Sequence, residues 1–199
     1  MLKKMVPDGD LQFGKDGVTI EFGPNANKNR SEFGKKLNDL IDSTNTWTII
    51  PDVKDSKNFK EPVGGPFTKP ANANGLATAS GLPGLGSGGE IHIPTSKSEY
   101  EFGAYDPNDR VQLTDPVIIF GHELFGHAWF LNNGTHDGRP QKWGDRPGHD
   151  QAIKVENLLR KFLAGKNELK PSELRGLWAN PMKGESMLRM RGTIEWKRP

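Results

Sequence analysis

Two histidines and one glutamate lie together in the stretch His122-Glu123-Leu124-Phe125-Gly126-His127. Imidazole is the commonest protein ligand for a divalent metal, and a carboxylate beside a metal-activated water can take its proton. The chain has no cysteine, so a metal must be bound by histidine and carboxylate groups. We therefore predict that His122 and His127 are metal ligands and that Glu123 is a general base.

These residues lie on a predicted buried helix. Asp115 is a good N-cap residue, Pro116 is a good first helical residue, and 132–134 (Asn-Asn-Gly) make a plausible C-cap. Nearly every residue between the caps is apolar, so the helix should lie inside the protein. Its polar side chains must then be satisfied in apolar surroundings, which a metal bound by both imidazoles would achieve.

The spacing of the two histidines predicts an irregular helix. The common zinc-peptidase pattern places its histidines four residues apart, whereas His122 and His127 are five apart. A five-residue step turns ~140° beyond a full α-helical turn, compared with ~40° for four residues. A π-bulge would bring the two rings back onto one face, and Gly126 lowers its cost because it has no Cβ.

The stretch 122–127 resembles the HEXXGH zinc motif of the dipeptidyl peptidase III family, with which only these six residues match. A longer part of the chain is similar to small zincin-type metallopeptidase domains of bacterial polymorphic toxins and secretion-system effectors. That similarity covers an initial strand, a Gly-rich stretch, the strand Glu90–Pro94, the His-Glu helix and the later sequence 155–160 (Val-Glu-Asn-Leu-Leu-Arg). Those domains usually keep the four-residue spacing, from which this chain departs by one inserted residue.

The resemblance implies an α+β fold, namely a small zincin-like metallopeptidase domain with a mixed sheet and a central zinc-binding helix. It also favours Glu156 as the third zinc ligand. Independently, the helix predicted from Asp150 to about Ala164 places Glu156 at the edge of its apolar face, where a ligand is expected. The alternative is an exposed ion pair of Glu156 with Arg160. Other candidates for the third ligand are His136, His149 and Asp150.

Further site residues are less strongly indicated. Zincins often add a tyrosine or histidine that stabilises the oxyanion, and Tyr105 and His136 are the candidates here. Pro94 has no amide donor, so the strand Glu90–Pro94 is predicted to be an edge strand, where zincins pair with an extended substrate. His92 lies on this strand and is a weaker candidate for the site.

The whole chain, 1–199, is predicted to form one domain, and its 24 glycines and 15 prolines indicate extensive loops. The Gly-rich stretch 81–89 is interpreted as a flexible surface loop. The other predicted elements are a loose lead-in at 1–16, a strand at 17–23, a helix at 29–42, a strand at 46–50 and a tail at 180–199.

Composition limits the partners and the location. A net charge of +2 is too mild to indicate nucleic-acid binding, and no run is long enough to span a membrane. The start of the chain lacks the apolar region of a classical signal peptide. The resemblance to effector and toxin domains implies a protein that is secreted or delivered into a target cell by a bacterial secretion system, with a delivery protein or an immunity protein as partner.

The predicted function is that of a zinc-dependent metallopeptidase. Zn2+ would activate a water molecule, Glu123 would take its proton, and a protein or peptide would be the substrate. Two alternatives remain open, because the motif specifies the attacking water and not the pocket. One is a non-catalytic, metal-stabilised module that binds another protein, and the other is a zinc amidase that acts on cell-wall peptides.

Overall fold

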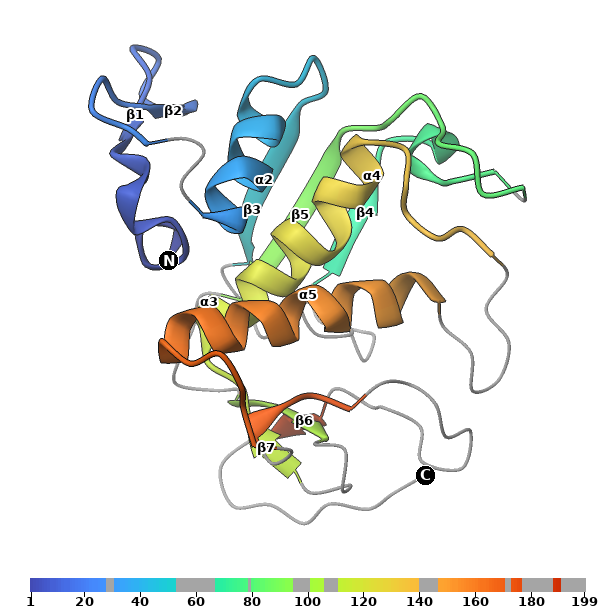
Figure 1. Ribbon diagram of the computed structural model, residues 1–199. Helices are drawn as coiled ribbons and strands as arrows, with labels where there is room; N and C mark the ends of the chain where they lie inside the picture. Colours follow the sequence, from blue (N-terminus) through green and yellow to red (C-terminus); the bar gives the residue numbers. More distant parts are fainter. Residues whose placement is uncertain are drawn as a thin grey trace, which may run out of the picture.

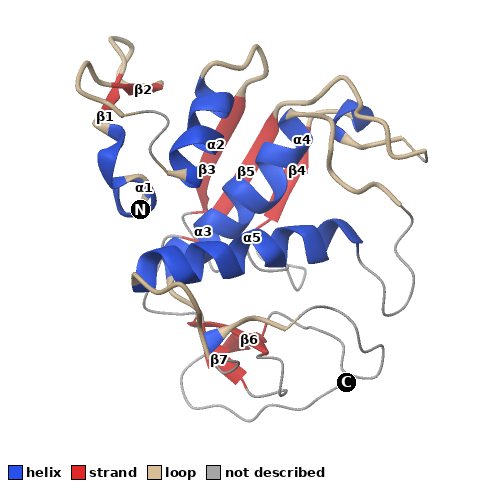
Figure 2. Cartoon of the chain, in the orientation of Figure 1, coloured by secondary structure: helices blue, strands red, loops and turns tan. Residues whose placement is uncertain are grey.

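The computed structural model describes residues 1–27, 31–52, 67–78, 80–94, 101–105, 111–139, 147–170, 173–176 and 188–190. These residues form an α+β fold with a mixed sheet, as predicted (Figure 1). Helices α2 (Glu32–Ile41) and α3 (Pro116–Gly121) lie on the same face of the central sheet, and α5 (Pro147–Ala164) crosses over α3 (Figure 2).

The central sheet has the strand order β3-β5-β4. Strand β5 (Gly89–Pro94) is parallel to β3 (Trp47–Asp52) and antiparallel to β4 (Phe67–Pro70). The prediction that 90–94 form an edge strand is therefore wrong. Pro94 is accommodated because it is the last residue of β5, in register with Asp52, where one missing amide donor disturbs little of the ladder.

The predicted metal-binding helix runs without interruption through α3, η3 (His122–Ala128) and α4 (Trp129–Asn132). Its caps are as predicted: the side chain of Asp115 accepts a hydrogen bond from the amide of Val117 at 2.7 Å, and Gly134 adopts a φ of 66° after the last turn. Segment η3 is a π-helix. The i→i+5 irregularity expected between His122 and His127 is thus confirmed, and it extends over seven residues.

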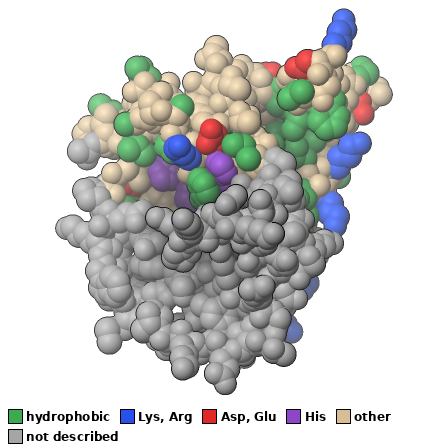
Figure 3. Space-filling view, turned by 180° about the vertical axis from the view of Figure 1, so that it is seen from behind, with side chains coloured by type: hydrophobic (Ala, Val, Ile, Leu, Met, Phe, Trp, Pro, Cys, Tyr) green, Lys and Arg blue, Asp and Glu red, His purple; other side chains and the backbone are tan. Residues whose placement is uncertain are grey.

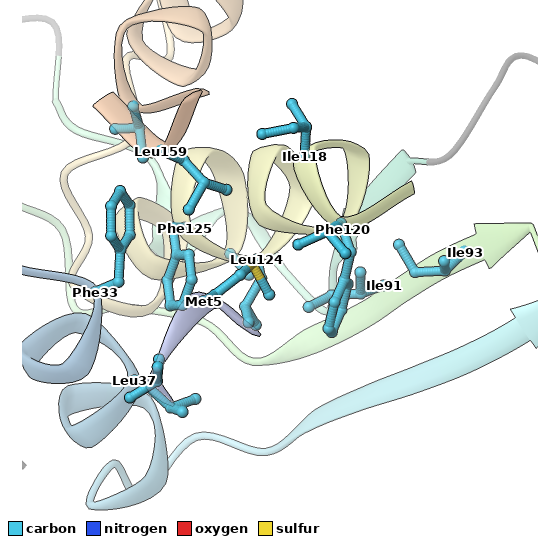
Figure 4. Close-up of a cluster of buried hydrophobic side chains, with 14 residues drawn as sticks. Met5, Phe33, Leu37, Ile91, Ile93, Ile118, Phe120, Leu124, Phe125 and Leu159 are labelled. Atoms are coloured by element: carbon cyan, nitrogen blue, oxygen red, sulfur yellow. The ribbon is translucent and has the colours of Figure 1, made fainter. Parts of the chain in front are cut away.

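The apolar core joins this helix to the sheet and to α2 (Figure 4). Phe120 and Leu124 lie on the side of Ile91 and Ile93, which alternate with outward-facing residues along β5. Phe33 of α2 contacts Phe125, with ring centroids 5.3 Å apart. The helix is therefore held from the sheet side by apolar contacts along most of its length.

Helix α5 packs against the opposite side of η3 at very short range. A Cβ on Gly126 would lie 2.8 Å from the Cβ and 2.9 Å from the Cα of Ala152. Gly126 is thus required for the approach of α5, in addition to easing the π-turn as the sequence suggested. The close approach determines which residues of α5 meet the histidines of η3.

The first residues of the chain belong to the core, so the prediction of a loose lead-in at 1–16 is wrong. They form α1 (Leu2–Met5), η1 (Pro7–Gly9) and β1 (Leu11–Phe13), which pairs with β2 (Ile20–Phe22). Met5 is 0% exposed and joins the same core cluster as Leu159. A four-residue helix with one buried side chain is too short to show a hydrophobic period in the sequence.

The Gly-rich stretch is a surface loop at Leu82 and Leu85, as predicted, but residues 86–88 are buried and held against the end of α4, which corrects the interpretation of that part. The amide of Ser87 donates to the carbonyl of Leu131 at 2.9 Å, and the amide of Gly84 donates to the carbonyl of Gly134 at 2.7 Å. Gly86 has a φ of 86° and lies so close to Asn132 that no Cβ would fit. The 3₁₀ turn η2 (Ala73–Gly75) precedes this stretch.

A third sheet has the order β7-β6-β8 and is built from β6 (Glu101–Tyr105), β7 (Val111–Leu113) and β8 (Leu188–Met190). Strand β8 falls within the tail predicted at 180–199, and the rest of that tail lies outside the described residues. Within the described part of the chain, no helix has the length and apolar character needed to cross a membrane.

Met5→Ala should lower the free energy of unfolding by about 2–5 kcal/mol, because it empties a fully buried site in the core. Leu85→Ala is the control, since Leu85 is 90% exposed and its truncation should cost less than ~0.5 kcal/mol. Urea denaturation followed by circular dichroism measures both. Equal small effects of the two substitutions would contradict the placement of the N-terminal helix in the core.

Candidate metal centre

Three histidines converge on one point beside η3. His122 and His127 come from η3, and His149 comes from the first turn of α5. One ring nitrogen from each lies within 4.8 Å of the others, so this group could hold a metal ion. Among the described residues, His149 is therefore a third candidate ligand beside the predicted pair His122 and His127.

The local backbone explains why the three rings meet. The π-turn brings His122 and His127 together, with ring centroids 5.0 Å apart. The contact of Gly126 with Ala152 then places the start of α5 beside both, and the ring of His149 lies 5.2 Å from that of His122. His122 is buried, whereas His127 and His149 are partly exposed, so one side of the group can be reached by water.

Glu156 contacts the Nδ1 side of the His122 ring. Its Oε2 lies 2.8 Å from Nδ1 of His122, and the carboxylate is 1% exposed. A neutral His122 therefore donates from Nδ1, which leaves Nε2 as the nitrogen that can face an ion. A carboxylate in this position fixes both the tautomer and the orientation of a ligand histidine.

This geometry revises the sequence-based choice of Glu156 as the third ligand. Both oxygens of Glu156 are occupied: Arg160 Nη2 donates to Oε1 at 2.7 Å, and Arg175 Nη1 donates to Oε2 at 2.7 Å. Glu156 is not a member of the group whose atoms could share an ion, and His149 is. The predicted pair of Glu156 with Arg160 is present, but it is buried and not exposed.

The charge of Glu156 is maintained inside the protein by its partners. Burial raises the pKa of Glu156, but Arg175, the hydrogen bond with His122 and then Arg160 outweigh it, and the pKa lies well below its usual range. Glu156 is therefore ionised at neutral pH and can accept the hydrogen bond from His122. An unpaired carboxylate at this depth would be strongly destabilising.

Arg175 was not identified from the sequence, although it lies in the centre of this network. Its guanidinium approaches two of the three histidines, with Nη1 3.4 Å from His122 Nδ1 and Nη2 3.5 Å from His149 Nε2. Asn157 holds its backbone from both sides, because the side-chain amide donates to the Arg175 carbonyl and the side-chain oxygen accepts from the Arg175 amide. The Glu-Asn pair at 156–157 thus fixes the side chain and the main chain of one arginine.

His136 lies behind His127 in the same way that Glu156 lies behind His122. Its Nε2 is 3.0 Å from Nδ1 of His127, and its main chain forms a bridge with Leu76, the residue that follows η2. Among the described residues, Nδ1 of His136 is buried without a hydrogen-bond partner. His136 was a candidate for oxyanion stabilisation and for ligation, and the structure places it as a hydrogen-bond partner of His127.

The surroundings of His122 and His127 favour the neutral forms of these two rings. Burial lowers the pKa of His122, and burial followed by the neighbouring His122 and His149 lowers the pKa of His127 well below its usual value. A metal ligand must be deprotonated, so these rings are in the form that binds a metal at neutral pH. A divalent ion would also remove the cost of leaving several ring nitrogens in a partly buried cluster.

Glu123 follows His122 directly and is 3% exposed. Its Oε2 accepts a hydrogen bond from the hydroxyl of Thr68 on β4 at 2.8 Å. Burial raises the pKa of Glu123 to about 8, while the hydrogen bond from Thr68 lowers it. A nearby cation favours the ionised form of such a carboxyl group, so metal binding would increase the fraction of Glu123 that is ionised, and able to accept a proton, at neutral pH.

The remaining candidates lie outside the three-histidine group. His92 stacks on Phe67 at 4.2 Å and alternates with the inward-facing Ile91, so it is on the sheet face away from η3. Asp150 is not among the residues that could share the ion. Tyr105 is the last residue of β6, and its side chain lies outside the described part of the structure.

Figure 3 shows histidine side chains at the surface, beside basic, acidic and apolar groups and next to the part of the chain that is not described. Comparison of the chain with known protein families, with curated proteins and with solved structures gave no match. The function must therefore be inferred from the site itself.

His149→Ala should weaken metal binding more than Glu156→Gln, because it removes a donor atom and not the group that orients one. Loss of an orienting partner typically costs about 10- to 100-fold in affinity. Titration with Zn2+ against a chromophoric chelator measures both, and circular dichroism confirms folding. His92→Ala is the control and should bind as the unmodified protein does. Full affinity in His149→Ala together with lost affinity in Glu156→Gln would return Glu156 to the ligand set.

Proposed function

We propose that this protein is a zinc-dependent metallopeptidase. The observation that carries the proposal is the combination of three converging imidazoles with a buried carboxylate one residue along the same helix. Three imidazoles suit Zn2+, and catalytic zinc sites typically combine three protein ligands with one open position. His122, His127 and His149 would hold the ion here.

The protein's own residues can perform the proton transfers of peptide hydrolysis. Zinc, when bound, would supply Lewis acidity towards a water molecule and a carbonyl oxygen. Glu123 would accept a proton from the attacking water and pass it to the nitrogen of the leaving amine. Glu156 and His136 would keep His122 and His127 in the tautomers that present Nε2, through Nδ1 contacts of 2.8 Å and 3.0 Å.

The sheet suggests where an extended substrate would lie. Among the described strands, β4 is at the edge of the central sheet, and its residue Thr68 contacts Glu123. A peptide that adds to such an edge is held by main-chain hydrogen bonds without a demand for one sequence. This supports a protein or peptide substrate, with β4 taking the role that the sequence had suggested for β5.

The site geometry favours catalysis over a purely structural metal. A structural zinc site is closed by four protein ligands, whereas the described group has three and is partly exposed at His127 and His149. An amidase that acts on cell-wall peptides would use the same water and the same base, so it remains the alternative within the enzyme class. Delivery by a bacterial secretion system, and pairing with an immunity protein, remain proposals that rest on the resemblance.

Glu123→Gln should retain the metal and lose turnover by at least ~10²-fold, the usual contribution of a general base. The measurement is cleavage of a denatured protein mixture by the zinc-loaded protein, with product peptides identified by mass spectrometry. Glu90→Gln, a change of the same type on the outer face of the sheet, is the matched control and should cleave normally.

This assay, run in parallel on cell-wall peptides and combined with a count of the zinc ligands, distinguishes the three functions. Peptide cleavage that disappears in Glu123→Gln supports the peptidase. Cleavage of cell-wall peptides alone would support the amidase and overturn the peptidase. Zinc bound by four protein ligands, with no hydrolysis of either substrate, would identify a structural site.

A further inference from the structure

We infer that Thr68 is a positioning residue for the general base, holding the carboxylate of Glu123 at a fixed angle to the metal-binding group. The inference rests on the proposed function, because it assigns a role in the same site. Thr68 belongs to β4 and is 55 residues from Glu123 in the sequence. Its contact with Glu123 therefore joins the edge of the sheet to the catalytic helix.

The hydroxyl of Thr68 lies close to two acceptor oxygens of the same glutamate. The hydroxyl of Thr68 lies 2.8 Å from Oε2 of Glu123 and 3.2 Å from the main-chain carbonyl of the same residue. One hydroxyl thus lies between the side chain and the backbone of Glu123 and restricts rotation of the carboxylate. With Oε2 held by Thr68, Oε1 is the oxygen left to approach a water molecule.

The surroundings give this hydrogen bond its importance. Glu123 is 3% exposed and is flanked by the buried residues His122 and Leu124, so solvent does not orient its carboxylate. Thr68 itself faces η3 because residues alternate along β4, and its register partner on β5 is the buried Ile91. Its neighbours Phe67 and Lys69 are directed to the other face, so no other described residue of β4 substitutes for the hydroxyl.

A purely structural role is the competing explanation, since the same hydroxyl also lies within hydrogen-bond distance of a carbonyl of the π-helix. The two explanations differ in whether the effect of losing the Thr68 hydroxyl requires the carboxylate of Glu123. A positioning residue affects turnover only while Glu123 can act as a base. A structural residue affects metal binding, substrate binding and residual activity whether or not residue 123 is a glutamate.

The first measurement compares Thr68→Val with Thr68→Ser in the zinc-loaded protein on a peptide substrate. Thr68→Val keeps the shape and removes the hydroxyl, and it should lower kcat by about 10- to 100-fold, the usual effect of one hydrogen bond to a charged group. KM and zinc content should not change. Thr68→Ser restores the hydroxyl and should recover kcat to within about threefold of the original value.

A double-mutant cycle then identifies the residue through which Thr68 acts. In the Glu123→Gln background, Thr68→Val should cause no further loss of the residual rate. An equal loss in both backgrounds, a rise in KM in place of a fall in kcat, or a failure of Thr68→Ser to recover activity would overturn the inference.

A binding measurement separates this inference from the proposed function. Acetohydroxamate chelates a divalent metal and presents its polar hydrogens to a neighbouring carboxylate, so its Kd reports the placement of Glu123 without turnover. Thr68→Val should raise the Kd about tenfold and Thr68→Ser less than about twofold, with no effect of Thr68→Val in the Glu123→Gln background. A Kd unchanged by Thr68→Val would overturn the inference.

If the expected pattern appears but no peptide is cleaved, the proposed peptidase function fails and the role of Thr68 stands.

Discussion

The separation of His122 and His127 by five residues is the constraint on which the site depends. A regular α-helix would direct the two rings apart, and the π-helical hydrogen bonds of η3 bring them together. The wider turn places Gly126 against Ala152, where no side chain would fit, and this contact lets α5 approach. His149 and Glu156 reach the centre because α5 lies so close. One irregular segment therefore organises the residues of two helices.

The site also depends on a buried charge, the carboxylate of Glu156, which is stabilised by ion pairs with neighbouring side chains. Glu156 is ionised in the interior between His122, Arg160 and Arg175, and such a cluster is tolerated only when every member has a partner. A buried ion network contributes little net stability, so its value here lies in orientation. It fixes the ring of His122, while Asn157 fixes the main chain of Arg175 beside it.

The features of the fold and site that could be predicted from the sequence are those that depend on residues close together in the chain. The caps, the apolar period and the histidine spacing all belong to one continuous segment, and they gave the helix, its π-turn and two of the three histidines. The choice between His149 and Glu156 depended on how α5 is rotated about its own axis, which a helical period alone does not determine. Thr68 and Arg175 lie 55 and 53 residues from their partners on η3, so no local signal linked them to the site.

X-ray absorption spectroscopy of the zinc-loaded protein can decide whether three histidines bind the ion, because it counts the ligands that surround the metal. We expect three imidazole nitrogens at about 2.0–2.1 Å and one further oxygen from solvent. In the His149→Ala protein the imidazole count should fall from three to two. A spectrum with two imidazoles and a carboxylate in the unmodified protein, unchanged by His149→Ala, would contradict this expectation.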